Sequence, residues 1–160
     1  MRPVIEIPIE SLPPVDEHEV DVRATEAQTW DALIDTLPRI IGGPLVRVFG
    51  PVWRLEHTEA AGDLGTTGST LPGFVVARAV RPAVLGLLGQ HRFSRYALVF
   101  RIEKTDTGVR LRAETRAEFP GASGRVYRAL VIGTRGHVVA VRRMLASVRR
   151  RAERRPAPAA

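Results

Sequence analysis

The chain contains no cysteine, which excludes disulfide bonds, thiolate metal sites and cysteine nucleophiles. No apolar run approaches the roughly 20 residues that a membrane-spanning helix needs. The first residues also lack the long apolar segment of a signal peptide. These absences are typical of the reducing cytoplasm, and we expect a cytoplasmic location.

Length and composition predict one globular domain. With 160 residues, 44% hydrophobic and 26% charged, the chain is long enough to bury a single core. Residues 1–16 contain four prolines and no stable period, so we expect an extended arm there. The domain should span residues 17–155, with a frayed tail at 156–160.

Lysine is nearly absent, and the positive charge is concentrated at one end. Seven arginines and one glutamate lie in residues 142–155, so nearly all of the net charge of +7 falls there. Such a segment could bind RNA or an anionic membrane surface. No aromatic residue lies among the arginines to stack on bases, so we expect no nucleic-acid partner. A peripheral membrane contact stays open, beside the simpler interpretation of a solvated helix end.

The most informative pattern is the strict alternation of residues 109–119, VRLRAETRAEF. One side carries small or apolar residues and the other carries alternating arginine and glutamate, which predicts an antiparallel strand with one buried face. The middle of that face, Ala113, Thr115 and Ala117, is too small to fill the space before a sheet. Either another element fills that space or a ligand cavity remains.

The remaining elements follow from periodicity and turn signals. Thr25 should cap a helix that Pro38 ends, followed by a short helix or turn up to residue 49. The Gly-rich segment 62–73 is predicted to be a turn, and it lacks the lysine of a phosphate-binding loop. Asp106, Thr107 and Gly108 predict a hairpin turn. The expected strands span residues 17–23, 52–59, 74–81, 84–93, 96–102 and 109–119.

The last segment changes to a helical period. Apolar residues recur at steps of three and four from Tyr127 to Val148, which predicts one long helix ended by Pro156. Gly133 and Gly136 each weaken it by roughly 1 kcal/mol relative to alanine. They should either kink the helix or let the sheet approach closely.

This order of elements resembles the START-like (SRPBCC) superfamily. The segment VDVRATEAQTWDALID resembles its first strand and helix, and GVRLRAETRAEF with the following Tyr- and Arg-containing helix resembles its last strand and closing helix. The resemblance covers roughly residues 17–155 and implies an α+β helix-grip fold. In that fold a curved antiparallel sheet wraps a long C-terminal helix, with two short helices after the first strand. START lipid-transfer domains, plant pollen-allergen-like proteins and bacterial polyketide cyclase relatives belong to this superfamily.

The resemblance implies a hydrophobic small-molecule partner held between sheet and closing helix. Members bind lipids, sterols or polyketides, some are cyclases or aromatases, and many have no known reaction; no metal or nucleotide cofactor is implied. The predicted lining consists of inward-facing residues: Trp53, Phe74, Val76, Phe93, Tyr96, Leu98, Phe100, Leu111, Ala113, Thr115, Tyr127, Val131, Thr134 and Val138.

Three histidines are candidates for proton transfer: His57, His91 and His137. No two histidines have a metal-ligand spacing, so no sequence-local metal site is expected. Arg78 or Tyr127 could polarise a carbonyl or hold a carboxylate. The alternative is that the histidines are satisfied by backbone or water and that Arg78 points to solvent.

Three functions therefore remain open from the sequence. The first is binding of a hydrophobic or amphipathic molecule in a cavity of about 300 Å³ or more. The second is a cyclase, aromatase or dehydratase of the same fold, which requires at least two polar side chains to converge on one ligand position. The third is an interaction through the basic C-terminal helix end.

Overall fold

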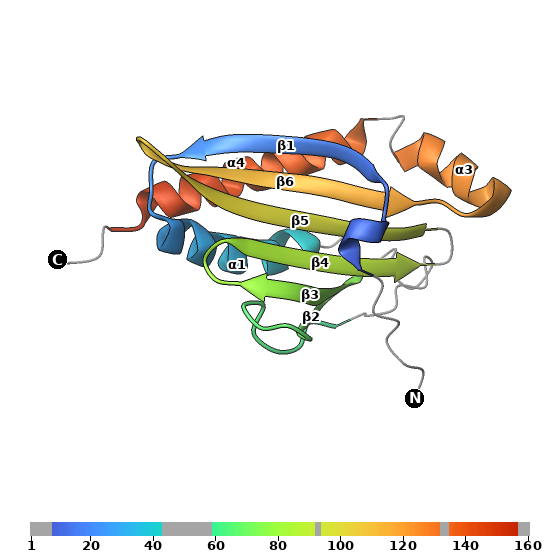
Figure 1. The fold of residues 1–160 in the computed structure, drawn as a ribbon, viewed down its shortest axis with the longest axis horizontal. Helices are drawn as coiled ribbons and strands as arrows, with labels where there is room; N and C mark the ends of the chain where they lie inside the picture. Colours follow the sequence, from blue (N-terminus) through green and yellow to red (C-terminus); the bar gives the residue numbers. More distant parts are fainter. Residues whose placement is uncertain (1–7, 43–58, 92–93, 132–134, 157–160) are drawn as a thin grey trace.

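The computed structural model describes residues 8–42, 59–91, 94–131 and 135–156, excluding the side chains of His91, Ser123, Tyr127, Leu130 and Val131. These residues form one sheet with the two longest helices on one face, the α+β helix-grip architecture that the sequence predicts (Figure 1). The antiparallel sheet has the strand order β1-β6-β5-β4-β3-β2. The strands are β1 (Pro14–Val22), β2 (Thr70–Leu71), β3 (Phe74–Val80), β4 (Val84–His91), β5 (Ser94–Thr105) and β6 (Gly108–Glu118). The helices are η1 (Ile9–Ser11), α1 (Glu26–Ile41), α3 (Gly121–Val131) and α4 (Gly136–Arg154).

Strands β5 and β6 form the centre of the sheet, and their alternation sets its two faces. They pair from Arg95↔Glu118 to Thr105↔Gly108, with a tight turn at Asp106 and Thr107. Gly108 has a φ of 154°, and a Cβ there would lie 2.2 Å from the carbonyl oxygen of Val22. Only glycine fits this hairpin against β1. The strand expected at residues 52–59 lies almost wholly outside the described residues.

Helix α1 follows β1 and packs its apolar stripe on the sheet. Thr25 and Gln28 form a reciprocal capping box, as Thr25 predicts, and Trp30, Leu33 and Leu37 are buried. The prediction that Pro38 ends this helix is wrong. The helix continues to Ile41, because a proline so close to the end costs one backbone hydrogen bond and leaves the last turn intact.

The predicted closing helix is two helices. Helix α3 ends at Val131 and α4 begins at Gly136, where Arg135 takes the left-handed conformation with a φ of 57°. The break falls at the glycines that weaken the helical pattern. Helix α4 then buries Val141, Leu145 and Val148 against α1 and the sheet.

Residues 8–13 cross the other face of the sheet. Ile9 and Leu12 form a small second core with Ala97 and Val99. Figure 1 shows η1 in front of the sheet and helices α1 and α4 behind it. Strand β1 begins at Pro14, earlier than the expected start at residue 17. We call the face covered by α1 and α4 the inner face and the face crossed by η1 the outer face.

Candidate functional site

The inner face is closed at one end and reached by solvent at the other. Near the β5–β6 hairpin, Phe100, Leu111 and Ala113 are fully buried within the main core. Towards α3, Phe74 and Tyr96 are only half-buried. The inner face is therefore packed solid around the second half of α4, and it is less completely buried towards the first turn of that helix, which we call the open end.

Four polar side chains meet at the open end. Strand pairing places Asp16 of β1 opposite Thr115 of β6 and His18 opposite Ala113, so all three side chains share the inner face. His137, in the first turn of α4, lies against them: its Nε2 is 2.9 Å from Oγ1 of Thr115, a hydrogen bond. We call Asp16, His18, Thr115 and His137 the polar cluster.

The carboxylate of Asp16 lies between two imidazoles. Nε2 of His18 is 3.4 Å from its Oδ2, and Nε2 of His137 is 3.5 Å from its Oδ1. The side chains of His18, Asp16 and His137 are 15%, 19% and 23% exposed. Oδ1 of Asp16 is buried and has no hydrogen-bond partner among the residues that the structure describes. A buried carboxylate oxygen is costly when unpaired, so the cluster has unused capacity to accept a hydrogen bond.

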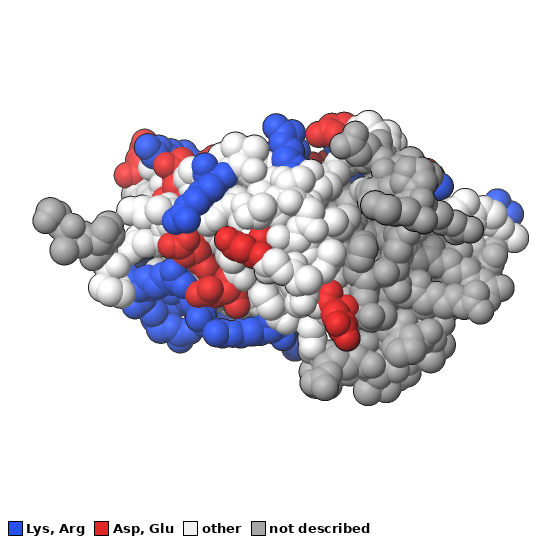
Figure 2. All heavy atoms as spheres, turned by 90° about the horizontal axis from the view of Figure 1, so that it is seen from below, with Lys and Arg blue, Asp and Glu red and all other residues white. Residues whose placement is uncertain are grey.

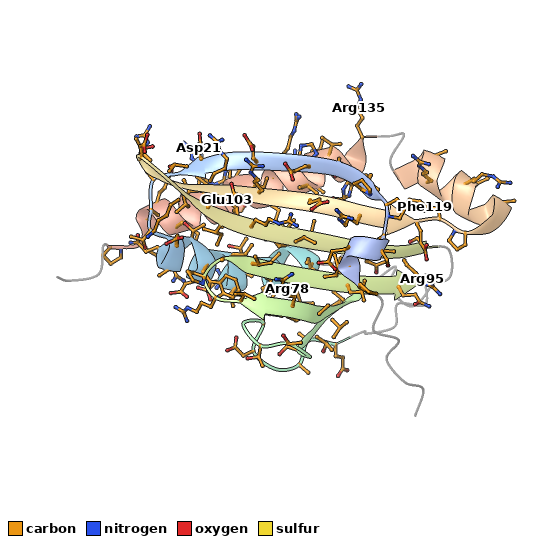
Figure 3. All side chains as sticks on the ribbon, viewed as in Figure 1. Asp21, Arg78, Arg95, Glu103, Phe119 and Arg135 are labelled. Atoms are coloured by element: carbon orange, nitrogen blue, oxygen red, sulfur yellow. The ribbon has the colours of Figure 1, made fainter. Side chains whose placement is uncertain are left out.

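Among the predicted catalytic residues, His137 enters this cluster and Arg78 does not. Arg78 lies on the outer face, 57% exposed, with Nη1 3.6 Å from Oε1 of Glu10 (Figure 3). A Cβ added at Gly86 would contact both Arg78 and Ile9, so these three residues lie together on the outer face. His57 lies outside the described residues, and so do the side chains of His91 and Tyr127.

The predicted lining residues divide along the inner face. Val76, Leu98, Phe100, Leu111 and Ala113 belong to the closed core. The open end contains the other described members of the set: Phe74, Tyr96, Thr115 and Val138. Trp53, Phe93, Thr134 and the side chain of Val131 lie outside the described part of the chain.

The Tyr96 hydroxyl forms a hydrogen bond within the protein. It donates a hydrogen bond of 2.8 Å to the carbonyl oxygen of Gly73, and its ring meets Phe74 edge-to-face at 5.1 Å. A Cβ at Gly89 would lie 2.3 Å from the Tyr96 ring, so this close packing needs glycine. Tyr96 and Phe74 thus form a rigid aromatic wall at the open end.

The sequence prediction did not include Asp16 and His18 in the site. The sequence does contain a pattern that predicts the position of His18. It lies two and four residues before Val20 and Val22, so in a strand its side chain points to the same face as theirs, towards the core. Asp16 has the same parity, but the prolines before it favour an extended arm. A β-bulge between Pro14 and Asp16 lets the strand include both residues.

Two hollows on the described surface lie away from the polar cluster. One, of about 270 Å³, is lined by Trp30 and ion-paired side chains including Asp35 and Arg155. The other, of about 670 Å³, lies beside the start of α1. Neither includes a residue of the predicted lining, so the cavity between sheet and α4 stays a prediction. The described residues contain no group of three side chains placed to hold a metal ion.

Several arginines at the basic end of α4 form ion pairs within the chain. Arg151 and Arg155 both reach Asp35 of α1, and Arg149 pairs with Glu153 at 3.2 Å. Figure 2 shows acidic and basic side chains lying next to one another on this side of the molecule. The backbone N–H of Arg23 donates to Glu153, and this bond lowers the pKa of Glu153 despite the opposing effect of burial. These contacts hold α4 against α1 and the end of β1.

Solved structures of low sequence identity share this architecture. A truncated norcoclaurine synthase from Thalictrum flavum has a TM-score of 0.56 and 13% identity, covering 91% of this chain and 99% of that one. A protein from Chromobacterium violaceum gives 0.56 and 10%, covering 89% and 100%. An uncharacterized protein from Rhizobium leguminosarum gives 0.58 and 12%, covering 91% and 98%. No protein-family model and no curated protein matches the sequence.

These likenesses define the class of the fold. The chain has the START-like helix-grip fold, and the resemblance read from the sequence is confirmed at the level of architecture. At such identities the shared fold does not carry an activity with it. Among the described residues, no helix is both long and apolar enough to cross a membrane.

Proposed function

We propose that the protein binds a hydrophobic or amphipathic small molecule, such as a lipid or polyketide, between the sheet and α4 at the end next to α3. The observation that carries this proposal is the change along the inner face. One end is closed core, whereas the other combines half-buried aromatic side chains with an incompletely satisfied polar cluster. Apolar walls with a few convergent polar groups are typical of small-molecule sites.

The side chains at this end favour a ligand of mixed polarity. Phe74, the ring of Tyr96 and Val138 offer apolar surface to the body of such a molecule. Asp16 and His137 offer hydrogen-bonding groups to a polar head. The neighbour from Thalictrum flavum, a synthase by its name, indicates that this fold can support chemistry on a small organic compound.

The experiment is native mass spectrometry of the purified protein, followed by titration with the fluorescent probe 8-anilinonaphthalene-1-sulfonate. Val138→Trp would place a large ring at the proposed site, whereas Val139→Trp would place it on the side of α4 that faces solvent. We expect Val138→Trp to weaken probe binding about tenfold, a loss of about 1.4 kcal/mol, and Val139→Trp to leave it unchanged. Equal binding by both variants, with no co-purified molecule, would contradict the proposal.

An enzyme of the same fold, a cyclase, aromatase or dehydratase, is the second candidate. It is supported by the convergence of His137, Thr115 and Asp16, since proton-transfer chemistry needs several polar groups at one ligand position. An RNA or membrane partner at the basic end of α4 is less well supported. Arg149, Arg151 and Arg155 already have acidic partners within the chain.

A further inference from the structure

The geometry around His137 determines which of its ring nitrogens holds a hydrogen. A bare Nε2 would direct its lone pair at Oδ1 of Asp16, 3.5 Å away, and the two would repel. An Nε2–H is attracted to that oxygen and can donate to Oγ1 of Thr115 at 2.9 Å. The carboxylate thus selects the form of His137 that is protonated on Nε2.

This assignment leaves Nδ1 as the basic atom of the ring. Within the described part of the chain Nδ1 makes no hydrogen bond, because the contacts of His137 are made through Nε2. The side chain is 23% exposed, so a molecule bound at the open end can reach the ring. An imidazole held at one nitrogen by a hydroxyl group and next to a carboxylate, with the other nitrogen unpaired, can act as a general base.

The charges around Asp16 are matched to a protonated imidazole. Among the described residues, no arginine or lysine contacts this carboxylate; the side chains within 4 Å of it that can take up a proton are His18 and His137. A proton taken up by His137 would supply a cation beside Asp16, whose Oδ1 has no hydrogen-bond partner among the described residues. His18, on the other oxygen, holds the carboxylate in place. The carboxylate of Asp16 therefore lies beside the ring on which a positive charge forms when His137 removes a proton.

We propose that the polar cluster is a proton-transfer centre acting on an apolar carbonyl compound with an acidic hydrogen next to the carbonyl group. His137 is the catalytic base, while Asp16, Thr115 and His18 are positioning residues. This inference rests on the small-molecule site proposed above.

The reaction is an enolisation that needs no co-reactant. The C–H bond beside the carbonyl breaks and an N–H bond forms at Nδ1, while the electron pair passes to the substrate as an enolate. Return of the proton to carbon or oxygen regenerates neutral His137. Oxidation states and atoms balance within the substrate and the imidazole.

The test follows exchange of the α-hydrogens of 2-tetralone, an apolar enolisable ketone, in D2O by proton NMR. Saturation-transfer difference spectra of the same samples measure the bound fraction, and each rate is divided by it. We expect the wild-type protein to accelerate exchange and His137→Gln to reduce the rate per bound ketone about 100-fold. Asp106→Asn, in the exposed β5–β6 turn, is the matched control for Asp16→Asn and should leave the rate unchanged.

A purely structural role for Asp16 predicts that Asp16→Asn lowers the bound fraction of 2-tetralone. The positioning role predicts an unchanged bound fraction and a lower exchange rate per bound ketone, because the variant has no counter-charge beside His137. Bound ketone with an exchange rate unaffected by His137→Gln would overturn the proton-transfer centre and leave the binding proposal standing. Absence of any saturation transfer to 2-tetralone would overturn both.

Discussion

Glu114 is a buried acid on the outer face of the sheet, held between two arginines. Its Oε2 accepts a hydrogen bond of 2.7 Å from Arg101, and its Oε1 accepts one of 2.7 Å from Arg116. Burial by itself would raise the pKa of Glu114, but the hydrogen bond from Arg101 and the charge of Arg116 outweigh it and lower the pKa. Arg116 also donates to the carbonyl oxygens of Glu10 and Leu12, so this group ties the N-terminal segment to the sheet.

The lowered pKa of Glu114 predicts acid sensitivity. Because the folded pKa lies below the ordinary glutamate pKa of 4.5, the contribution of Glu114 to stability is complete above that pH and is lost as the pH falls through the folded pKa. Glu114→Gln should lower the free energy of unfolding by about 1–3 kcal/mol at neutral pH and lessen its decline in acid. Urea unfolding at pH 7 and pH 3.5 measures both effects. Glu103→Gln, at an exposed pair (Figure 3), is the control, and an equal loss in the two variants would contradict the prediction.

At the residue scale, the sequence could predict inward and outward faces but not partners. The alternation of residues 109–119 correctly places Ala113 and Thr115 on the inner face. Asp16 was missed because a proline pair normally disfavours a strand, and only pairing with β6 reveals it. Arg78 was a candidate by residue type alone, and a β-bulge between Val76 and Arg78 alters the alternation of β3 at that point.

At the scale of elements, the break between α3 and α4 is the feature that shapes the candidate site. It starts a new helix at Gly136 and thereby places His137 in a first turn beside the sheet. Glycine content indicated a weak point, but a sequence pattern cannot distinguish a kinked helix from two helices. That choice depends on tertiary packing, as does the continuation of α1 through Pro38.

The left-handed residue before α4 gives a test of this element. Arg135, which projects from the start of α4 in Figure 3, has a φ of 57°, a conformation that costs a non-glycine residue about 1 kcal/mol. Arg135→Gly should therefore raise the free energy of unfolding by about that amount. Arg143→Gly, in the exposed middle of α4, should lower it by about 1 kcal/mol. Thermal unfolding compares the two, and a loss of stability in both would show that Arg135 is not strained.

At the scale of the whole molecule, α4 is fixed at its two ends by different interactions. Its last turns pair with Asp35 of α1 and bury Val148 and Ala152, whereas its first turn contacts the sheet through His137. Deletion of residues 149–160 would therefore remove part of the core along with the arginines. Exchange of Arg142 and Arg143 for glutamine is the cleaner way to examine an anionic partner, since both are exposed.

The central claim is that small molecules bind at the open end of the inner face, and amide chemical shifts test it most directly. Titration of ¹⁵N-labelled protein with 8-anilinonaphthalene-1-sulfonate should move the signals of Thr115, His137 and Val138. The signals of Val22 and Ala152, in the closed core, should stay in place. Shifts confined to the hollow around Trp30 or to the arginine-rich side of α4 would contradict the account.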